Sequence, residues 1–272
     1  MRRELYLRSA EITPGLILTL LVCAAVIITT IGRSGLVANA SSMASLDPSF
    51  GTGGMVATPF FGFKDICEAL AIQADGKIIA SGYAETTAQS NFGWAIARYN
   101  TDGSIDSSFG TGGVAQDPNL SVASALALQP DGKIVAAGSS PGSGSADFAI
   151  ARYNTDGSLD TSFGGTGIVV MDVGDGLFDL ALAVAIQPDG KIVTAGAASR
   201  GTQANTDFAI VRYNSDGSVD TSFGVNGIAT LDFFSGSPDE INSIAIQPDG
   251  KIVAGGFTVQ TSPAAEWALC TL

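Results

Sequence analysis

The chain has 272 residues, a formal net charge of −13 and no histidine. The acidic balance argues against nucleic acids and anionic membrane surfaces as partners, because both select a basic face. Without histidine there is no Ser-His-Asp triad, no Cys-His pair and no histidine-ligated zinc or iron. Only 14% of the residues are charged and 46% are hydrophobic, which argues against a disordered chain.

The N-terminal 40 residues are typical of an export signal. Arg2, Arg3 and Arg8 precede an apolar run over residues 15–31, and Ala38-Asn39-Ala40 fits the small-x-small cleavage pattern. Cleavage there would leave a mature chain of residues 41–272. The apolar run is long for a signal peptide, so an uncleaved membrane anchor is the alternative. Both interpretations predict a secreted or cell-surface protein that contacts the membrane only through residues 15–31, if these are retained.

Two motifs recur four times along the rest of the chain. QADGKIIASG begins at Gln73, and close copies begin at Gln129, Gln187 and Gln247, roughly 60 residues apart. LDPSFGTGG from Leu46 keeps pace with it, with copies from Ile105, Leu159 and Val219. Such a period indicates supersecondary units that stack to share a core. We therefore divide the chain into repeats at about 46–104, 105–158, 159–218 and 219–272.

The sequence of each repeat predicts four short strands. In the third repeat these are residues 167–171, 180–187, 191–197 and 207–213, here called strands a, b, c and d. Pro188-Asp189-Gly190 predicts a tight hairpin between b and c. Strand b alternates small and large apolar residues, so both of its faces should be covered. The predicted fold is all-β and propeller-like: four repeats, each a four-stranded antiparallel meander, packed face to face.

A longer string carries a family resemblance. DFAIARYNTDGSLDTSFG spans residues 147–164, and a near copy spans residues 207–224, with QPDGKIV between the two. Together these resemble the delta-60 repeat family of exported bacterial proteins over about residues 46–272. The resemblance implies a β-propeller-like fold and export. It implies no activity.

The last repeat departs from the pattern. Trp267 stands where Phe148 and Phe208 stand, and Thr271 replaces the arginine that ends strand d elsewhere. The given sequence stops at Leu272 within the motif, which leaves three interpretations: a small four-bladed ring, a truncated product, or a partial ring completed in a homo-oligomer. A disulfide between Cys67 and Cys270 is conceivable if the first and last repeats touch; two buried thiols are the alternative.

The a–b and c–d loops differ between repeats and should share one face, which makes that face the candidate site. Its predicted binding residues are Phe60, Phe61, Phe63, Asp65, Asp175, Asp179, Phe233, Phe234, Asp239 and Glu240. Aromatic rings beside carboxylates suit an extracellular glycan or protein ligand. The alternatives are that the rings enter the core while the acids are solvated, or that Asp175/Asp179 or Asp239/Glu240 serve a carbohydrate-active hydrolase or lyase.

Other charged residues recur in every copy. Arg98, Arg152 and Arg212 are predicted to pair with Asp106, Asp160 and Asp220, a scaffold role, because an active site is normally needed once. Asn154-x-Asp156-Gly157-x-x-Asp160 resembles a calcium loop in its spacing of oxygens but lacks the full signature, and Asx-Gly turns need no metal. We therefore expect no cofactor, with calcium as the one cation to consider, and a non-catalytic binding or structural module with an unknown ligand.

Overall fold

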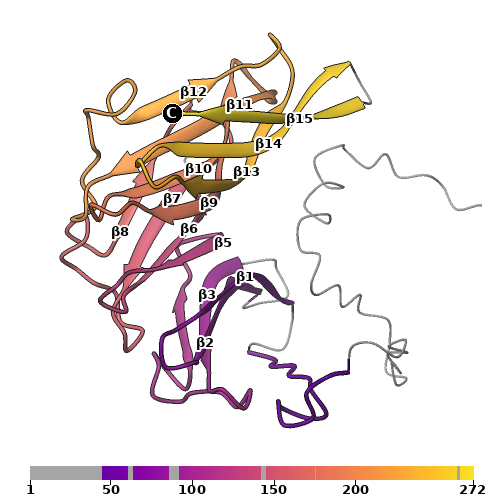
Figure 1. Cartoon of the computed structure of the whole chain (residues 1–272), viewed down its shortest axis with the longest axis vertical. Coiled ribbons are helices and arrows are strands. Elements are labelled where there is room, and N and C mark those ends of the chain that lie inside the picture. Colours follow the sequence, from indigo (N-terminus) through magenta and orange to yellow (C-terminus); the bar gives the residue numbers. More distant parts are fainter. Residues whose placement is uncertain (1–44, 61–63, 86–91, 142–144, 175, 262–263) are drawn as a thin grey trace, which may run out of the picture. The chain divides into compact units, whose positions relative to one another are not determined.

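The computed structural model describes residues 45–60, 64–85, 92–141, 145–174, 176–261 and 264–272. Leu46–Leu272 forms one compact unit, distinct from Met1–Ser45. Every regular element in the described residues is a β-strand (Figure 1). No helix in that part of the chain is long and apolar enough to cross a bilayer.

The strands form four antiparallel sheets in chain order. The first sheet contains β1 (Asp65–Ile72), β2 (Ile78–Glu85), β3 (Phe92–Tyr99) and β4 (Val114–Asp117). The second contains β5 (Val122–Leu128), β6 (Ile134–Pro141), β7 (Ala146–Tyr153) and β8 (Ile168–Met171). The third contains β9 (Asp179–Ile186), β10 (Ile192–Arg200), β11 (Thr202–Tyr213) and β12 (Ile228–Leu231). The fourth contains three strands, β13 (Asp239–Ile246), β14 (Ile252–Thr261) and β15 (Ala264–Thr271). The predicted all-β, propeller-like array is confirmed.

The sheets do not coincide with the repeats as the sequence divides them. Strand a closes the preceding sheet: β8 pairs with β7, with Phe148 opposite Met171 and Ala151 opposite Ile168. The reason is local, because the Asn-x-Asp-Gly turn after strand d folds the chain straight back, as the Tyr153–Leu159 bridge shows. Each complete sheet is therefore b-c-d plus the next strand a. Among the described residues the fourth sheet has three strands instead of the predicted four, because strand a of each other sheet comes from the following repeat.

One glycine in strand c is required by a bulge in strand b. The register of β9 on β10 slips between Ala195 and Gly196, where the strands approach closely. A Cβ on Gly196 would lie 1.9 Å from the carbonyl oxygen of Leu180. The equivalent glycines of the other three sheets have the same close approach. The final glycine of the GKIVxxG motif therefore permits the bulge, which increases strand twist.

The cores lie between consecutive sheets. The face of a sheet toward the next one, here its forward face, presents large residues, such as Phe148 and Ile150 of β7. They pack on small residues of the next sheet's rear face, such as Ala181 and Ala209. This arrangement recurs in all three inter-sheet cores. The expected covering of both sheet faces is thus confirmed for the two middle sheets.

The expected burial of the two thiols is wrong. Cys67 is exposed on the rear face of the first sheet, Cys270 is half-buried, and no disulfide joins them. At the position of Cys67 the second and third sheets carry Ala123 and Ala181, both fully buried. The difference arises because no sheet in the described chain covers the rear face of the first sheet.

Candidate functional site

The recurring charged residues meet at one carboxylate in each of the first three sheets. In the second sheet the Arg152 Nε and the Lys133 Nζ each lie 2.8 Å from Asp160 Oδ2. The hydroxyl of Ser162 donates to the other oxygen at 2.6 Å. Hydrogen bonds from Lys133 and Ser162 hold the pKa of Asp160 well below its usual range. The predicted Arg–Asp ion pairs are confirmed, also for Arg98–Asp106 and Arg212–Asp220, both at 2.7 Å.

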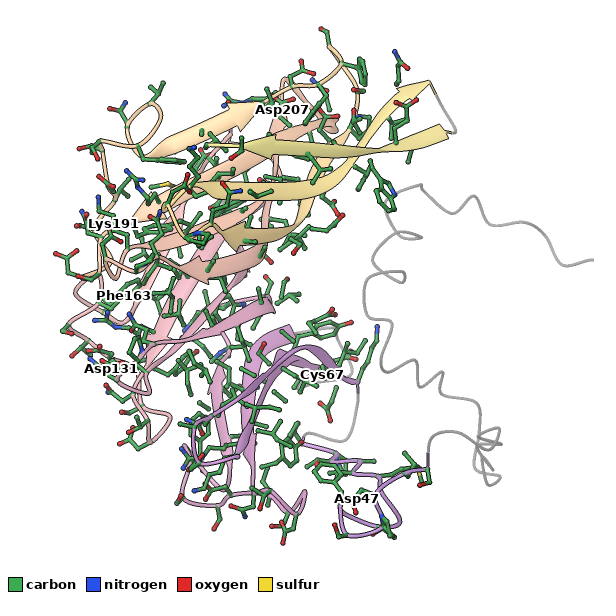
Figure 2. The ribbon with its side chains drawn as sticks, viewed as in Figure 1. Asp47, Cys67, Asp131, Phe163, Lys191 and Asp207 are labelled. Carbon is green, nitrogen blue, oxygen red and sulfur yellow. The ribbon has the colours of Figure 1, made fainter. Side chains whose placement is uncertain are left out.

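Sequence reasoning missed two further roles of this arginine. The Arg152 guanidinium lies over the Phe163 ring, 4.7 Å from its centroid. Its Nη1 also donates to the backbone carbonyl of Ser215, in the d–a turn of the next sheet. Figure 2 labels Phe163 and Lys191 among these recurring turns. The joint recurrence of Arg-Tyr-Asn and Ser-Phe-Gly was the available signal, since stacking of arginine on an aromatic ring needs both.

The acids of the calcium-like turn already have protein partners. Asp156 Oδ1 accepts hydrogen bonds from the backbone N–H and the hydroxyl of Ser158, at 2.9 and 2.6 Å. Asp160 forms ion pairs with Lys133 and Arg152. The spacing that suggested a metal loop therefore serves an Asx turn and an ion pair. These recurring turns also line a depression of about 520 Å³ between the first two sheets, with Tyr153 and Asp117 among its residues.

On the variable-loop face, the predicted acid Asp179 braces a backbone loop. Its side chain is fully buried (0% exposed) at the start of β9. One carboxylate oxygen accepts the N–H groups of Val173 and Gly174, at 2.7 and 2.9 Å. The other accepts the N–H of Ser199 at 3.2 Å. Burial nevertheless raises the pKa of Asp179. The side chain fixes the a–b loop and does not point to solvent.

Asp239 and Asp65 hold the same position in other sheets. Asp239 is also fully buried, and its Oδ2 accepts the N–H of Phe233 at 2.7 Å. Asp65 is half-buried and accepts the N–H of Phe60 at 2.8 Å. These three acids therefore brace equivalent loops in different sheets. Neither the prediction of solvated acids nor the prediction of ligand-binding acids anticipated this role.

The remaining predicted site residues that the structure describes are Phe60, Phe233, Phe234 and Glu240. Phe233 packs edge-on against Phe208 of the third core, with centroids 4.9 Å apart. Phe60 and Phe234 are half-buried. Glu240 accepts a hydrogen bond from Asn242 at 2.8 Å, and burial raises its pKa. Phe61, Phe63 and Asp175 lie outside the described residues. For Phe233, the alternative that the rings enter the core is correct.

Two acid clusters lie beside the braces. Carboxylate oxygens of Asp147, Asp172 and Asp179 come within 4.8 Å of one another, and so do those of the equivalent residues Asp207, Asp232 and Asp239. Burial raises the pKa of Asp147, of Asp179 and of Asp239. Carboxylate oxygens are donors that a hard cation prefers, so the clusters could attract one. Each cluster contains one brace: both oxygens of Asp179 accept backbone N–H groups, and Asp239 accepts one through its Oδ2. Asp147 and Asp207 could be recognised from the recurring Asp-Phe-Ala-Ile, but their proximity to the loop acids could not.

Stacked four-stranded antiparallel sheets with recurring turns define a repeat protein of the β-propeller type. In agreement, the family DUF5122, a domain of unknown function described as a beta-propeller, matches residues 73–109, 129–163 and 187–223. These matches support a β-propeller repeat family, and the delta-60 resemblance stays a prediction. No curated protein matches the chain significantly in sequence.

The solved structures that match the chain include proteins of several kinds. An unknown-function protein from Dyadobacter fermentans has a TM-score of 0.43 at 14% identity, covering 74% of this chain and 64% of its own. A putative gluconolactonase has a TM-score of 0.34 at 14% identity, with coverage of 70% and 57%. The family 43 glycoside hydrolase YxiA from Bacillus licheniformis has a TM-score of 0.39 at 13% identity, with coverage of 74% and 55%. This chain spans less than two thirds of the length of each.

Proposed function

We propose that the chain is an exported, non-catalytic repeat module with a binding or structural role at the cell exterior. The observation that carries the proposal is the state of the candidate acids. Asp179 and Asp239 are fully buried, and both accept hydrogen bonds from the backbone of their own loops. A carboxylate that braces the backbone and has no exposed surface cannot contact a substrate. Export rests on the basic, then apolar, N-terminal sequence and its Ala38-Asn39-Ala40 cleavage pattern.

The alternative, a carboxylate-dependent hydrolase, is favoured by the raised pKa values of Asp179 and Asp239. A raised pKa is what a general acid needs. The same constellation, however, occurs between two successive pairs of sheets, each time with the brace fully buried. A structural device repeats with the sheet, whereas a reaction centre needs to be built once. Recurrence therefore favours the scaffold role.

Activity measurements on residues 41–272 test the proposal. The purified protein would be incubated with aryl glycosides of the common pentoses and hexoses and with aldonolactones, from pH 4 to pH 8. We expect no turnover above that of a heat-treated sample. Turnover that is abolished by Asp179→Asn or Asp239→Asn, with the melting temperature unchanged, would overturn the proposal and establish the hydrolase.

A further inference from the structure

The forward face of the fourth sheet is bare where the other forward faces are covered. Trp267 on β15 is 93% exposed and Leu269 is 67% exposed. The equivalent residues of the second sheet, Phe148 and Ile150, are 1% and 0% exposed, because they fill the core against the third sheet. The fourth sheet thus presents the apolar half of an inter-sheet core.

The rear face of the first sheet presents the other half. Leu70 and Ile72 on β1 are 60% and 71% exposed. Their equivalents in the second sheet, Leu126 and Leu128, pack against the core made with the first sheet. The two bare faces are therefore the two sides of an interface that this chain already forms three times within itself.

The backbone is complementary as well. In the part of the chain that the structure describes, the fourth sheet contains three strands, one fewer than each other sheet. Residues Met55–Thr58 follow Phe50-Gly51-Thr52-Gly53-Gly54, as Val114–Asp117 of β4 follow the same five residues from Phe109 to Gly113. Among the described residues no strand lies alongside Val56–Thr58. Residues 55–58 therefore have the sequence position of the strand that the fourth sheet lacks.

This N-terminal segment is already held on the first sheet as a preceding sheet would hold it. The N–H of Gly51 donates to the carbonyl of Asp102 at 2.7 Å. Gly110 donates in the same way to Asp156 of the next turn, also at 2.7 Å. The segment thus occupies the outer-strand position of a sheet whose other three strands must come from elsewhere.

We propose that a second copy of this chain supplies them, with the fourth sheet of each copy packed on the first sheet of the other. In the β3–β4 register Trp94 faces Asp117 and Ala97 faces Val114. We apply the same register to the pairing of β15 with residues 55–58 of the second copy. It places Trp267 opposite Thr58 of the second copy, and Cys270 opposite Met55 of the second copy. Main-chain pairing would protect the open edge of β15. The two bare apolar faces would form a core of the same type as the three within the chain.

Charge complementarity supports the same joint between copies, in which the fourth sheet of one copy packs on the first sheet of the other. Asp47 occupies the position of Asp106, Asp160 and Asp220 in the recurring motif, and Lys251 occupies that of Lys77, Lys133 and Lys191. Those three lysines bind those three aspartates at 2.8–2.9 Å. Lys251 instead has a surface contact with Asp249, its side chain being 61% exposed, and Asp47 is exposed. The joint would bring Lys251 of one copy to Asp47 of the other.

A second copy fits better than closure of one chain on itself. Only consecutive sheets pack extensively in the described part of the chain, and no strand of the first sheet packs in that way on the fourth. Two head-to-tail copies form two identical joints and close with two-fold symmetry, which leaves no bare face. Eight sheets also lie within the usual propeller range of about four to eight blades.

The mass in solution tests association. For residues 41–272, which include the whole compact unit, we expect sedimentation equilibrium to give a dimer. Trp267→Asp should weaken the dimer at least about 30-fold, as loss of a central aromatic anchor does. Because Trp267 is 93% exposed in the single chain, this change should leave the monomer folded, which circular dichroism would check. Val225→Asp is the matched control, because Val225 is also apolar and is 77% exposed but lies in the turn between β11 and β12 of the third sheet. A monomeric wild-type protein would overturn the proposal.

A disulfide tests the register. In a Cys67→Ala background, Met55→Cys should form a disulfide with Cys270, because directly opposed residues lie within the Cα separation that a disulfide spans. We expect a covalent dimer under oxidising, denaturing conditions. Val56→Cys, whose side chain would point to the opposite sheet face, should not cross-link. A disulfide within one chain, or a dimer without the Met55→Cys cross-link, would overturn the proposed joint. These readouts are masses, so they can fail independently of the activity test of the proposed function.

Discussion

The guanidinium of Arg152 donates to the backbone carbonyl of Ser215, 63 residues along the chain. The same side chain binds Asp160 at 2.8 Å and covers the ring of Phe163. Arg98 makes the equivalent set of contacts, with Thr155 as its distant carbonyl. In the first two sheets one arginine therefore joins its own d–a turn to the turn of the following sheet, and this couples neighbouring repeats.

Asp160→Asn should reveal this coupling. The substitution leaves Arg152 and Lys133 without their shared counter-charge in a site where Asp160 is buried. We expect the free energy of unfolding to fall by roughly 2–4 kcal/mol, measured by urea denaturation at pH 7. Asp131→Asn, in an exposed turn, should change it by less than about 0.5 kcal/mol. Equal effects of the two substitutions would show that the Asp160 ion pairs do not stabilise the fold.

Stability should fall in acid. Hydrogen bonds from Lys77 and Ser108 hold the pKa of Asp106 below its usual range, and the pKa of Asp160 and Asp220 is lowered by the equivalent residues. The folded state then binds fewer protons than the unfolded state, so this stabilisation is complete above the unfolded pKa of about 3.9 and is lost as pH falls below it.

The raised pKa values of Asp179 and Asp239 act with the opposite sign, because the folded state takes up their protons first. We expect the three ion-paired aspartates to dominate below pH 4. The urea midpoint measured between pH 7 and pH 3 should therefore drop, and the drop should be smaller in Asp160→Asn. An identical drop in the variant would contradict this assignment.

Asp179→Ala should destabilise the protein through its loop. The change leaves the N–H groups of Val173, Gly174 and Ser199 without their acceptor, so we expect a loss of about 1–3 kcal/mol in thermal or urea unfolding. Asp172→Ala is the control, because Asp172 belongs to the same acid cluster but is exposed. If Asp172→Ala cost as much as Asp179→Ala, the bracing role would be wrong.

Two adjacent glycines of β14 should respond differently to alanine. A Cβ on Gly256 would lie 1.8 Å from the carbonyl oxygen of Glu240, whereas one on Gly255 would first meet Leu269 Cδ2 at 3.3 Å. Backbone cannot yield as a side chain can, so Gly256→Ala should cost about 2 kcal/mol or more. Gly255→Ala should be close to neutral, since Ala137 and Ala195 occupy that position in the second and third sheets. Melting temperatures of the two variants test this difference in stability.

The N-terminus of the exported protein tests the signal. Expressed with an export system, the chain should yield Ser41 as its first residue on mass spectrometry of the intact protein. Ala40→Leu should block cleavage, because the pattern requires a small residue there, and should leave the protein membrane-associated through residues 15–31. A wild-type protein that retains Met1 in the membrane fraction would favour the uncleaved anchor.

Much of the fold is local, and the sequence by itself determined it. All four predicted strands of the third repeat exist, and Pro188-Asp189-Gly190 lies at the predicted turn, although β10 ends at Arg200 and β11 begins at Thr202, beyond the predicted 191–197 and 207–213. Turn geometry and period-two alternation depend on neighbours in the sequence, so they can be read without the tertiary structure. The Arg152–Asp160 pair belongs to the same class, because one hairpin brings its members together.

Only the tertiary structure decided which residues are accessible. Nothing near Asp179 in the sequence distinguishes a solvated acid from a loop brace, since its burial depends on β10 and on the a–b loop. Likewise Phe148 and Trp267 have equivalent positions within the motif, yet one is 1% and the other 93% exposed. Burial is set by the sheet that packs on top, and that sheet comes from a distant part of the chain.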